Sequence, residues 1–73
     1  MRIKKPFGTG DIIIGKSSKP KYYNKLFRVA YILRFSGGYE LIGLHDGNTI
    51  LLDKITVNRH FELDNNGNIL YGD

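Results

Sequence analysis

The chain has 73 residues, enough for one small domain with a small hydrophobic core. Hydrophobic residues make up 41% and charged residues 25%, a composition typical of folded globular proteins. The absence of cysteine excludes disulfide bonds and thiolate metal sites. No apolar run reaches the length of about 20 residues that a membrane-spanning helix needs, and no signal-peptide core follows the first basic residues. We therefore expect a cytoplasmic protein.

The formal net charge of +4 is distributed unevenly along the chain. Residues 1–34 carry nine basic side chains and one acidic side chain, a net charge of +8. Residues 35–73 carry two basic and six acidic side chains, a net charge of −4. This split predicts either two oppositely charged faces or two halves that pair and neutralise each other on folding.

The first half of the chain predicts two strands separated by a long loop. Residues 8–11 predict a turn, and the β-branched run 12–14 between glycines predicts a short buried strand. Residues 16–25 contain Pro20 and have no apolar periodicity, which indicates a loop. Residues 26–35 alternate with period two, which favours a half-buried strand. The side chains expected in the core are those of one parity: Phe27, Val29, Tyr31, Leu33 and Phe35.

The second half predicts a hairpin with a register that the pattern leaves open. Residues 36–38 predict a tight turn, because Gly-Gly can take positive φ at both central positions without steric cost. Strands over 39–44 and 49–53 follow, joined through Asp46-Gly47. A two-residue turn would place Glu40 opposite Asp53, whereas a three-residue loop pairs Ile42 with Ile50. We favour the second register because it separates the two carboxylates.

The remaining segments complete an all-β prediction. Residues 54–59 favour a single helical turn and 60–63 a short closing strand; 65–68 indicate a turn, after which the chain either folds back or frays. Five short strands predict a small five-stranded barrel or a tightly curled sheet. We expect a single domain over residues 1–73, made of a flexible basic arm (1–6), a barrel (7–64) and a C-terminal turn and tail (65–73).

Four segments carry a resemblance to a known fold. They are the Gly-Asp-hydrophobic run 10–15, the strand 27–32, the hairpin 39–52 and the ending 60–63. With the long first loop, this layout resembles the Src-homology-3-like small barrels, including the KOW and Tudor-like members. It is also similar to small phage-encoded proteins of Gram-positive hosts, which often open with a Gly-Asp-hydrophobic strand and close with Phe-Glu-Leu. The resemblance implies a five-stranded barrel with at most one short helical turn.

The sequence offers little catalytic or metal-binding chemistry. His45 and His60 are the only side chains that ordinarily titrate near neutral pH. Each has an aspartate candidate partner, Asp46 or Asp53, but no nucleophile at a suitable spacing completes a catalytic set. Residues 64–68 lack the ligand spacing of a calcium loop, and residues 8–10 lack the lysine and helix of a phosphate-binding loop. We expect no enzymatic activity, no cofactor, no metal and no small-molecule substrate.

A basic and aromatic segment, residues 19–28, is the candidate binding site. Lysines can contact phosphates or carboxylates, and tyrosine rings can stack on bases or pack on a protein surface. The alternative is that Tyr22 or Tyr23 folds back over the barrel mouth while the lysines only solvate the loop. With basic residues that could extend the patch, the candidate binding residues are Lys4, Lys5, Lys16, Lys19, Lys21, Tyr22, Tyr23, Lys25 and Arg28.

These observations predict a small non-enzymatic binding module with an anionic partner, either nucleic acid or a nucleic-acid-handling complex. The resemblance to phage proteins implies an alternative, a stand-alone inhibitor or modulator that binds a host enzyme or defence protein directly. We expect no membrane partner. A homodimer is a further alternative, because contact between two copies would bury more apolar surface on the mixed face of the strand over 26–35.

Overall fold

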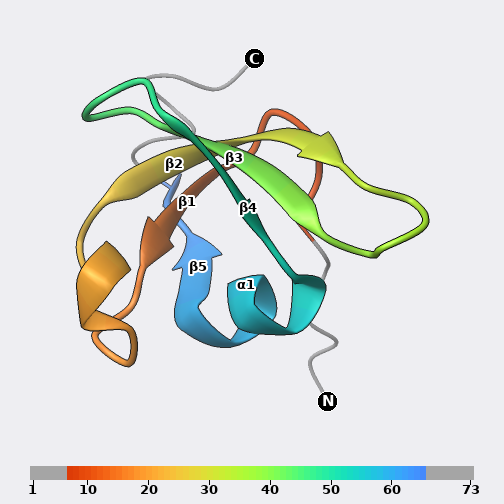
Figure 1. Cartoon of the computed structure of the whole chain (residues 1–73). Coiled ribbons are helices and arrows are strands. Elements are labelled where there is room, and N and C mark those ends of the chain that lie inside the picture. Colours follow the sequence, from red (N-terminus) through yellow and green to blue (C-terminus); the bar gives the residue numbers. More distant parts are fainter. Residues whose placement is uncertain (1–6, 66–73) are drawn as a thin grey trace.

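The structure is a computed structural model that describes residues 7–65. These residues form one open antiparallel sheet of five strands and one short α-helix (Figure 1). The strand order in the sheet is β4-β3-β2-β1-β5. The elements are β1 (Ile12–Gly15), the 3-10 turn η1 (Pro20–Tyr22), β2 (Leu26–Ile32), β3 (Tyr39–Gly43), β4 (Thr49–Leu52), α1 (Lys54–His60) and β5 (Phe61–Leu63). The predicted small, mostly β fold of five strands is confirmed.

The first strand of the sheet has a partner on both sides. Ile13 on β1 pairs with Phe27 on β2 and with Leu63 on β5, so the first and last strands of the described chain are neighbours. Ile12 and Ile13 are fully buried, as the run of β-branched residues between glycines predicts. The turn predicted before this strand is also present, closed by a hydrogen bond from Asp11 N to Gly8 O.

The hydrophobic core lies inside the curl of the sheet. Phe27 on β2 meets Phe61 on β5 with ring centroids 5.6 Å apart in an edge-to-face arrangement, although β1 separates the two strands in the sheet. The helix closes the same core through Val57. The buried cluster consists of Phe7, Ile13, Phe27, Val29, Tyr39, Leu41, Val57 and Phe61. Removing these side chains from water is the main stabilising contribution available to so small a fold.

The side chains of β2 that the alternation predicts to be buried are buried only as far as Val29. Phe27 and Val29 are buried, but Tyr31 is 57% exposed. A β-bulge causes the change: Val29 pairs with Leu41, yet Tyr31 pairs with Glu40, so the register shifts at the intervening residue. The strand also ends at Ile32, which leaves Phe35 in a loop and fully exposed. The prediction that Tyr31 and Phe35 belong to the core is therefore wrong, and Leu33 is only half-buried.

The turn between β2 and β3 is wider than predicted. Leu33 N donates to Gly38 O at 2.8 Å, and Gly37 N donates to Leu33 O at 2.9 Å. Gly37 has φ +70°, whereas Gly38 keeps a φ that any residue can adopt. Only one of the two glycines uses the positive φ that is accessible to both, because the turn spans residues 33–38 rather than a two-residue Gly-Gly connection.

The β3–β4 hairpin uses neither of the registers considered from the sequence. Leu41 pairs with Ile50 and Tyr39 with Leu52, and residues 44–47 form the loop. This register places the half-buried Ile50 and Leu52 beside the core residues of β3. A slip of one residue would turn those side chains to the other face of the sheet, so burial decides the register. Gly47 adopts φ +73° within the loop.

The helix predicted as a single turn extends over Lys54–His60, and η1 is a second helical segment, so the expectation of at most one short helical turn is wrong. Asp53 caps it, because its carboxylate accepts a hydrogen bond from Thr56 N at 3.2 Å and another from the Thr56 hydroxyl. The hydrogen bonds from Thr56 lower the pKa of Asp53. In the described part of the chain, no helix has the length and apolarity required to cross a membrane. The predicted basic arm with Lys4 and Lys5, and nearly all of the predicted tail, lie outside the described residues.

Candidate binding site at the lysine loop

Residues 16–25, called the lysine loop here, connect β1 to β2 along a defined path (Figure 1). Gly15 holds both ends together: Gly15 N donates to Lys25 O at 3.1 Å, and Asn24 N donates to Gly15 O at 3.0 Å. A second attachment joins the loop to the end of α1, where Lys16 N donates to His60 O at 2.7 Å. Ser18 Oγ also forms a hydrogen bond with His60 Nδ1 at 2.8 Å. The segment is therefore anchored at its base and along its side.

The lysines of this loop face solvent. Lys19, Lys21 and Lys25 are exposed, and Lys16 is half-buried. Within residues 7–65, no ion pair joins any of these four lysines to a carboxylate, and the loop itself contains no acidic residue. Direct neutralisation by the acidic half of the chain, one of the two alternatives for the charge split, does not occur at this loop in the described structure. The positive charge remains available to a partner.

The two tyrosines of the loop have different environments. Tyr22 is half-buried, with its ring centroid 5.9 Å from that of Phe27 and 5.4 Å from that of Phe61. Tyr23 is 57% exposed and stays on the surface. Tyr22 therefore folds back onto the core, as one part of that alternative predicts, whereas Tyr23 does not. Lys21 Nζ lies 5.6 Å from the Tyr22 ring centroid, a cation–π distance.

Arg28, the last of the predicted binding residues, occupies a different position. It lies on β2, where it pairs with Ile12 on one side and Ile42 on the other. Its side chain is half-buried. The structure thus groups Lys21, Tyr22 and Lys25 around one pocket and places Arg28 on strand β2.

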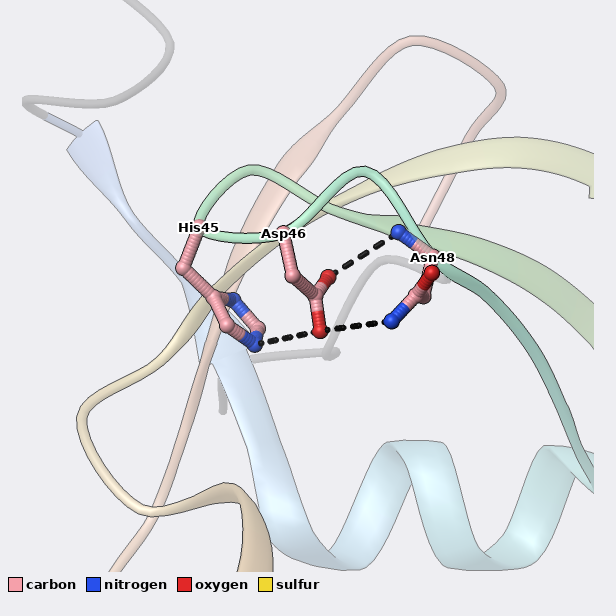
Figure 2. A network of polar contacts seen from close by, with 3 residues as sticks. All are labelled: His45, Asp46 and Asn48. Atoms are coloured by element: carbon pink, nitrogen blue, oxygen red, sulfur yellow. Dashed lines mark hydrogen bonds and ion pairs between the residues drawn. The ribbon is translucent and has the colours of Figure 1, made fainter.

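The β3–β4 loop carries a polar network that faces the lysine loop (Figure 2). His45 Nε2 lies 3.2 Å from Asp46 Oδ2. Asn48 N donates to Asp46 Oδ1 at 2.9 Å, and Asn48 Nδ2 donates to Asp46 Oδ2 at 3.1 Å. The backbone hydrogen bond from Asn48 is the main cause that lowers the pKa of Asp46, with smaller contributions from the nearby His45 and Lys25 charges. The carboxylate is therefore ionised at neutral pH and holds both neighbours in place.

A pocket of about 180 Å³ lies between the two loops. The lysine loop contributes Lys21, Tyr22 and Lys25 to its lining, β2 contributes Phe27, and the β3–β4 loop contributes His45, Asp46 and Asn48. A hydrogen bond of 3.0 Å from Leu44 N to Leu26 O joins the ends of the two loops beside it. A second hollow of about 500 Å³ adjoins the pocket and shares Lys25 and His45 with it.

The other predicted chemistry is only partly assembled. His45 and Asp46 do meet, but Asp53 and His60 stand at opposite ends of α1 and form no pair. Within residues 7–65, no three histidine, aspartate or glutamate side chains are grouped so that they could hold a metal ion. Most of the segment compared with a calcium loop, residues 64–68, lies outside the described residues.

Comparisons of the chain with protein-family models, with curated proteins and with solved structures find no match. The geometry of the lysine loop and its pocket is therefore the basis for a functional proposal.

Proposed function

We propose that the protein is a small non-enzymatic binding module that docks its lysine loop on an anionic partner, either nucleic acid or a nucleic-acid-handling complex. The observation that carries this proposal is the set of four lysines on one anchored loop, none with an ion pair to a carboxylate within residues 7–65. Lysines in this state bind phosphates and release the counterions around them, a sequence-independent source of affinity. Tyr23, exposed beside them, offers a ring on which a base can stack.

We also propose that the sheet belongs to the Src-homology-3-like small barrels and that the protein is of the phage type. The strand order supports the first part, because β5 pairs with β1 and the sheet curls far enough for Phe27 to touch Phe61. The position of α1 between β4 and β5 also supports it, although this helix of 7 residues is longer than the single turn that the resemblance implies. The phage-type opening and ending lie side by side as β1 and β5.

Binding to labelled single-stranded and double-stranded DNA and RNA, measured at low and moderate salt, tests the nucleic-acid proposal. We expect binding at low salt that weakens as salt rises, with a slope of about −0.7 to −0.9 per phosphate contact. The double variant Lys21→Glu with Lys25→Glu should lose binding while keeping its melting temperature within a few degrees. No binding to any of these nucleic acids at low salt would contradict the proposal.

The matched control moves the same change of charge away from the lysine loop. Arg34, in the turn after β2, and Lys54, at the start of α1, are both exposed and lie outside the loop. The double variant Arg34→Glu with Lys54→Glu should keep most of the binding. Equal losses in the two double variants would show that net charge, rather than the lysine loop, determines affinity.

A second candidate is a stand-alone inhibitor or modulator that binds a host enzyme or defence protein. The observation in its favour lies at the other end of β2, where Phe35 is fully exposed beside Tyr31 and Arg34 around a hollow of about 300 Å³. Aromatic and arginine side chains dominate the energetics of protein interfaces. A pull-down from bacterial lysate, treated with nuclease, should then retain a partner that the variant Phe35→Ser loses. A partner that nuclease removes would instead support the nucleic-acid function.

A further inference from the structure

Besides the half-buried aliphatic Ile50, the pocket between the lysine loop and the β3–β4 loop has walls of three chemical kinds. Tyr22 and His45 each meet Phe27 edge-to-face, with ring centroids 5.9 and 5.6 Å from it. Asp46 and Asn48 form a hydrogen-bonded polar wall. Exposed Lys21 and Lys25 complete the lining. A ligand that fits must therefore match an aromatic, a polar and a cationic surface at once.

The volume limits the size of that ligand. At about 180 Å³ the pocket is smaller than the roughly 300–1,000 Å³ of typical small-molecule sites. It has room for one planar ring system rather than for a larger organic molecule. The adjoining hollow of about 500 Å³ shares Lys25 and His45, so a chain attached to that ring can continue across the surface.

The charges exclude simpler occupants. A bare anion such as phosphate would lie against the ionised Asp46, and a cation such as a methylated ammonium would meet Lys21 and Lys25. An aliphatic group would neither stack on the aromatic wall nor form a hydrogen bond with the amide of Asn48. A neutral planar ring that has a hydrogen-bonding edge and is carried on an anionic backbone matches all three walls.

We propose that this pocket takes one unpaired nucleobase of a single-stranded nucleic acid, while Lys21 and Lys25 contact the phosphates on either side of it. This inference rests on the proposed nucleic-acid function and names its substrate class. A base in a duplex is stacked and paired, so its ring cannot enter the pocket, whereas a single strand presents its bases freely.

Asn48 is the residue that contacts the base edge. One of its Nδ2 protons is committed to Asp46 Oδ2, which leaves the amide oxygen and the second Nδ2 proton to pair with a base. An asparagine amide presents a donor and an acceptor side by side, an arrangement that matches the edge of a base. Asp46 acts through Asn48 as a positioning residue, and the His45 ring contributes a stacking surface.

Two oligonucleotides that differ only in their bases test the pocket. One is a labelled oligothymidylate of about 15 nucleotides, and the other is an abasic oligomer with the same phosphate backbone. At low salt we expect the wild-type protein to bind the oligothymidylate about tenfold more tightly than the abasic oligomer. Asn48→Ala and His45→Ala should each reduce this ratio towards one without changing affinity for the abasic oligomer. Thermal unfolding of each variant checks that the fold is retained.

The possible results distinguish failure of the base pocket from failure of the proposed nucleic-acid function. Equal affinity of the wild-type protein for both oligomers would overturn the base pocket and leave the lysine loop as a phosphate-binding surface. No binding of either oligomer at low salt would overturn both proposals. Tighter binding of duplex than of single strand would also overturn the base pocket. A 2-aminopurine placed within the oligomer gives an independent readout, because its fluorescence should be quenched by stacking in the wild-type complex and much less so with His45→Ala.

Discussion

The carbonyl oxygen of Tyr22 approaches Gly15 so closely that a Cβ atom at position 15 would lie 1.9 Å from it. The obstacle is backbone, so rotation of a side chain cannot relieve the contact. Gly15 also exchanges hydrogen bonds with Asn24 and Lys25 at the C-terminal end of the lysine loop. The shape of the loop therefore depends on the absence of a side chain at this one position.

Gly15→Ala should displace the lysine loop. Because backbone must move to admit the methyl group, we expect the free energy of unfolding to fall by about 1–3 kcal/mol and nucleic-acid binding to weaken. Urea denaturation and binding at low salt measure the two effects. Gly8→Ala is the control, since its Cβ would lie 3.7 Å from the nearest atom, Asp11 Oδ2, and should leave both quantities nearly unchanged.

Gly43→Ala should act on the pocket rather than on the fold. The new Cβ would lie 2.6 Å from Asp46 Oδ1 and 2.9 Å from His45 Cε1, which are ends of side chains that can rotate away. We expect a small loss of stability but a clear loss of the preference for base-bearing over abasic oligomers. If Gly43→Ala left that preference at the wild-type value, the His45–Asp46 arrangement would not form part of the binding site.

Val29→Asp and Tyr31→Asp should behave oppositely, although the alternating pattern places both residues on one face. Val29 is fully buried, so the substitution places an unpaired charge in the core, and we expect the domain to unfold. Tyr31 lies beyond the bulge and is exposed, so its substitution should change stability only slightly. Circular dichroism and thermal unfolding distinguish the two. Unfolding by both would contradict the bulge.

Acid should destabilise the protein partly through the cap of α1. Hydrogen bonds from Thr56 lower the pKa of Asp53 below its ordinary 3.8, so the folded state favours the ionised carboxylate. The resulting stabilisation is present above pH 3.8 and is lost as the pH falls through the lower pKa of the folded state. Melting temperatures measured against pH should therefore fall less steeply below pH 3.8 for Asp53→Ala than for the wild type. Parallel curves would show that the cap has no influence on acid stability.

Local pattern predicted where the strands lie but not how the sheet bends. A β-branched run between glycines marks β1, and the glycine-containing turns on either side mark the bounds of β3, because those signals act over a few residues. The bulge after Val29 belongs to the curl that brings Phe27 against Phe61, two residues far apart in the sequence. The alternation of apolar and polar residues over 26–35 contains no information about that contact, so it could not predict the bulge.

The candidate site was predictable on one side only. The lysines are visible in the sequence because they cluster within a few positions. His45, Asp46 and Asn48 join them through the pairing of β2 with β3, which brings Leu44 beside Leu26. A correct prediction that β2 pairs with β3 would have placed the β3–β4 loop beside the lysine loop. It could therefore have identified His45, Asp46 and Asn48 as the polar wall of the pocket.

The neighbouring positions of β1 and β5 determine when the fold can form on the ribosome. Ile13 lacks its second strand partner, and the core lacks Phe61, until residues 61–63 have emerged from the exit tunnel. Pairing between strands so distant in sequence is slow compared with hairpin formation. Lys16 and Ser18 also cannot form their hydrogen bonds with His60 until that residue has emerged. A nascent chain therefore acquires its organised lysine loop only after residues 60–63 have been synthesised, when the β2–β3–β4 meander is already available to fold.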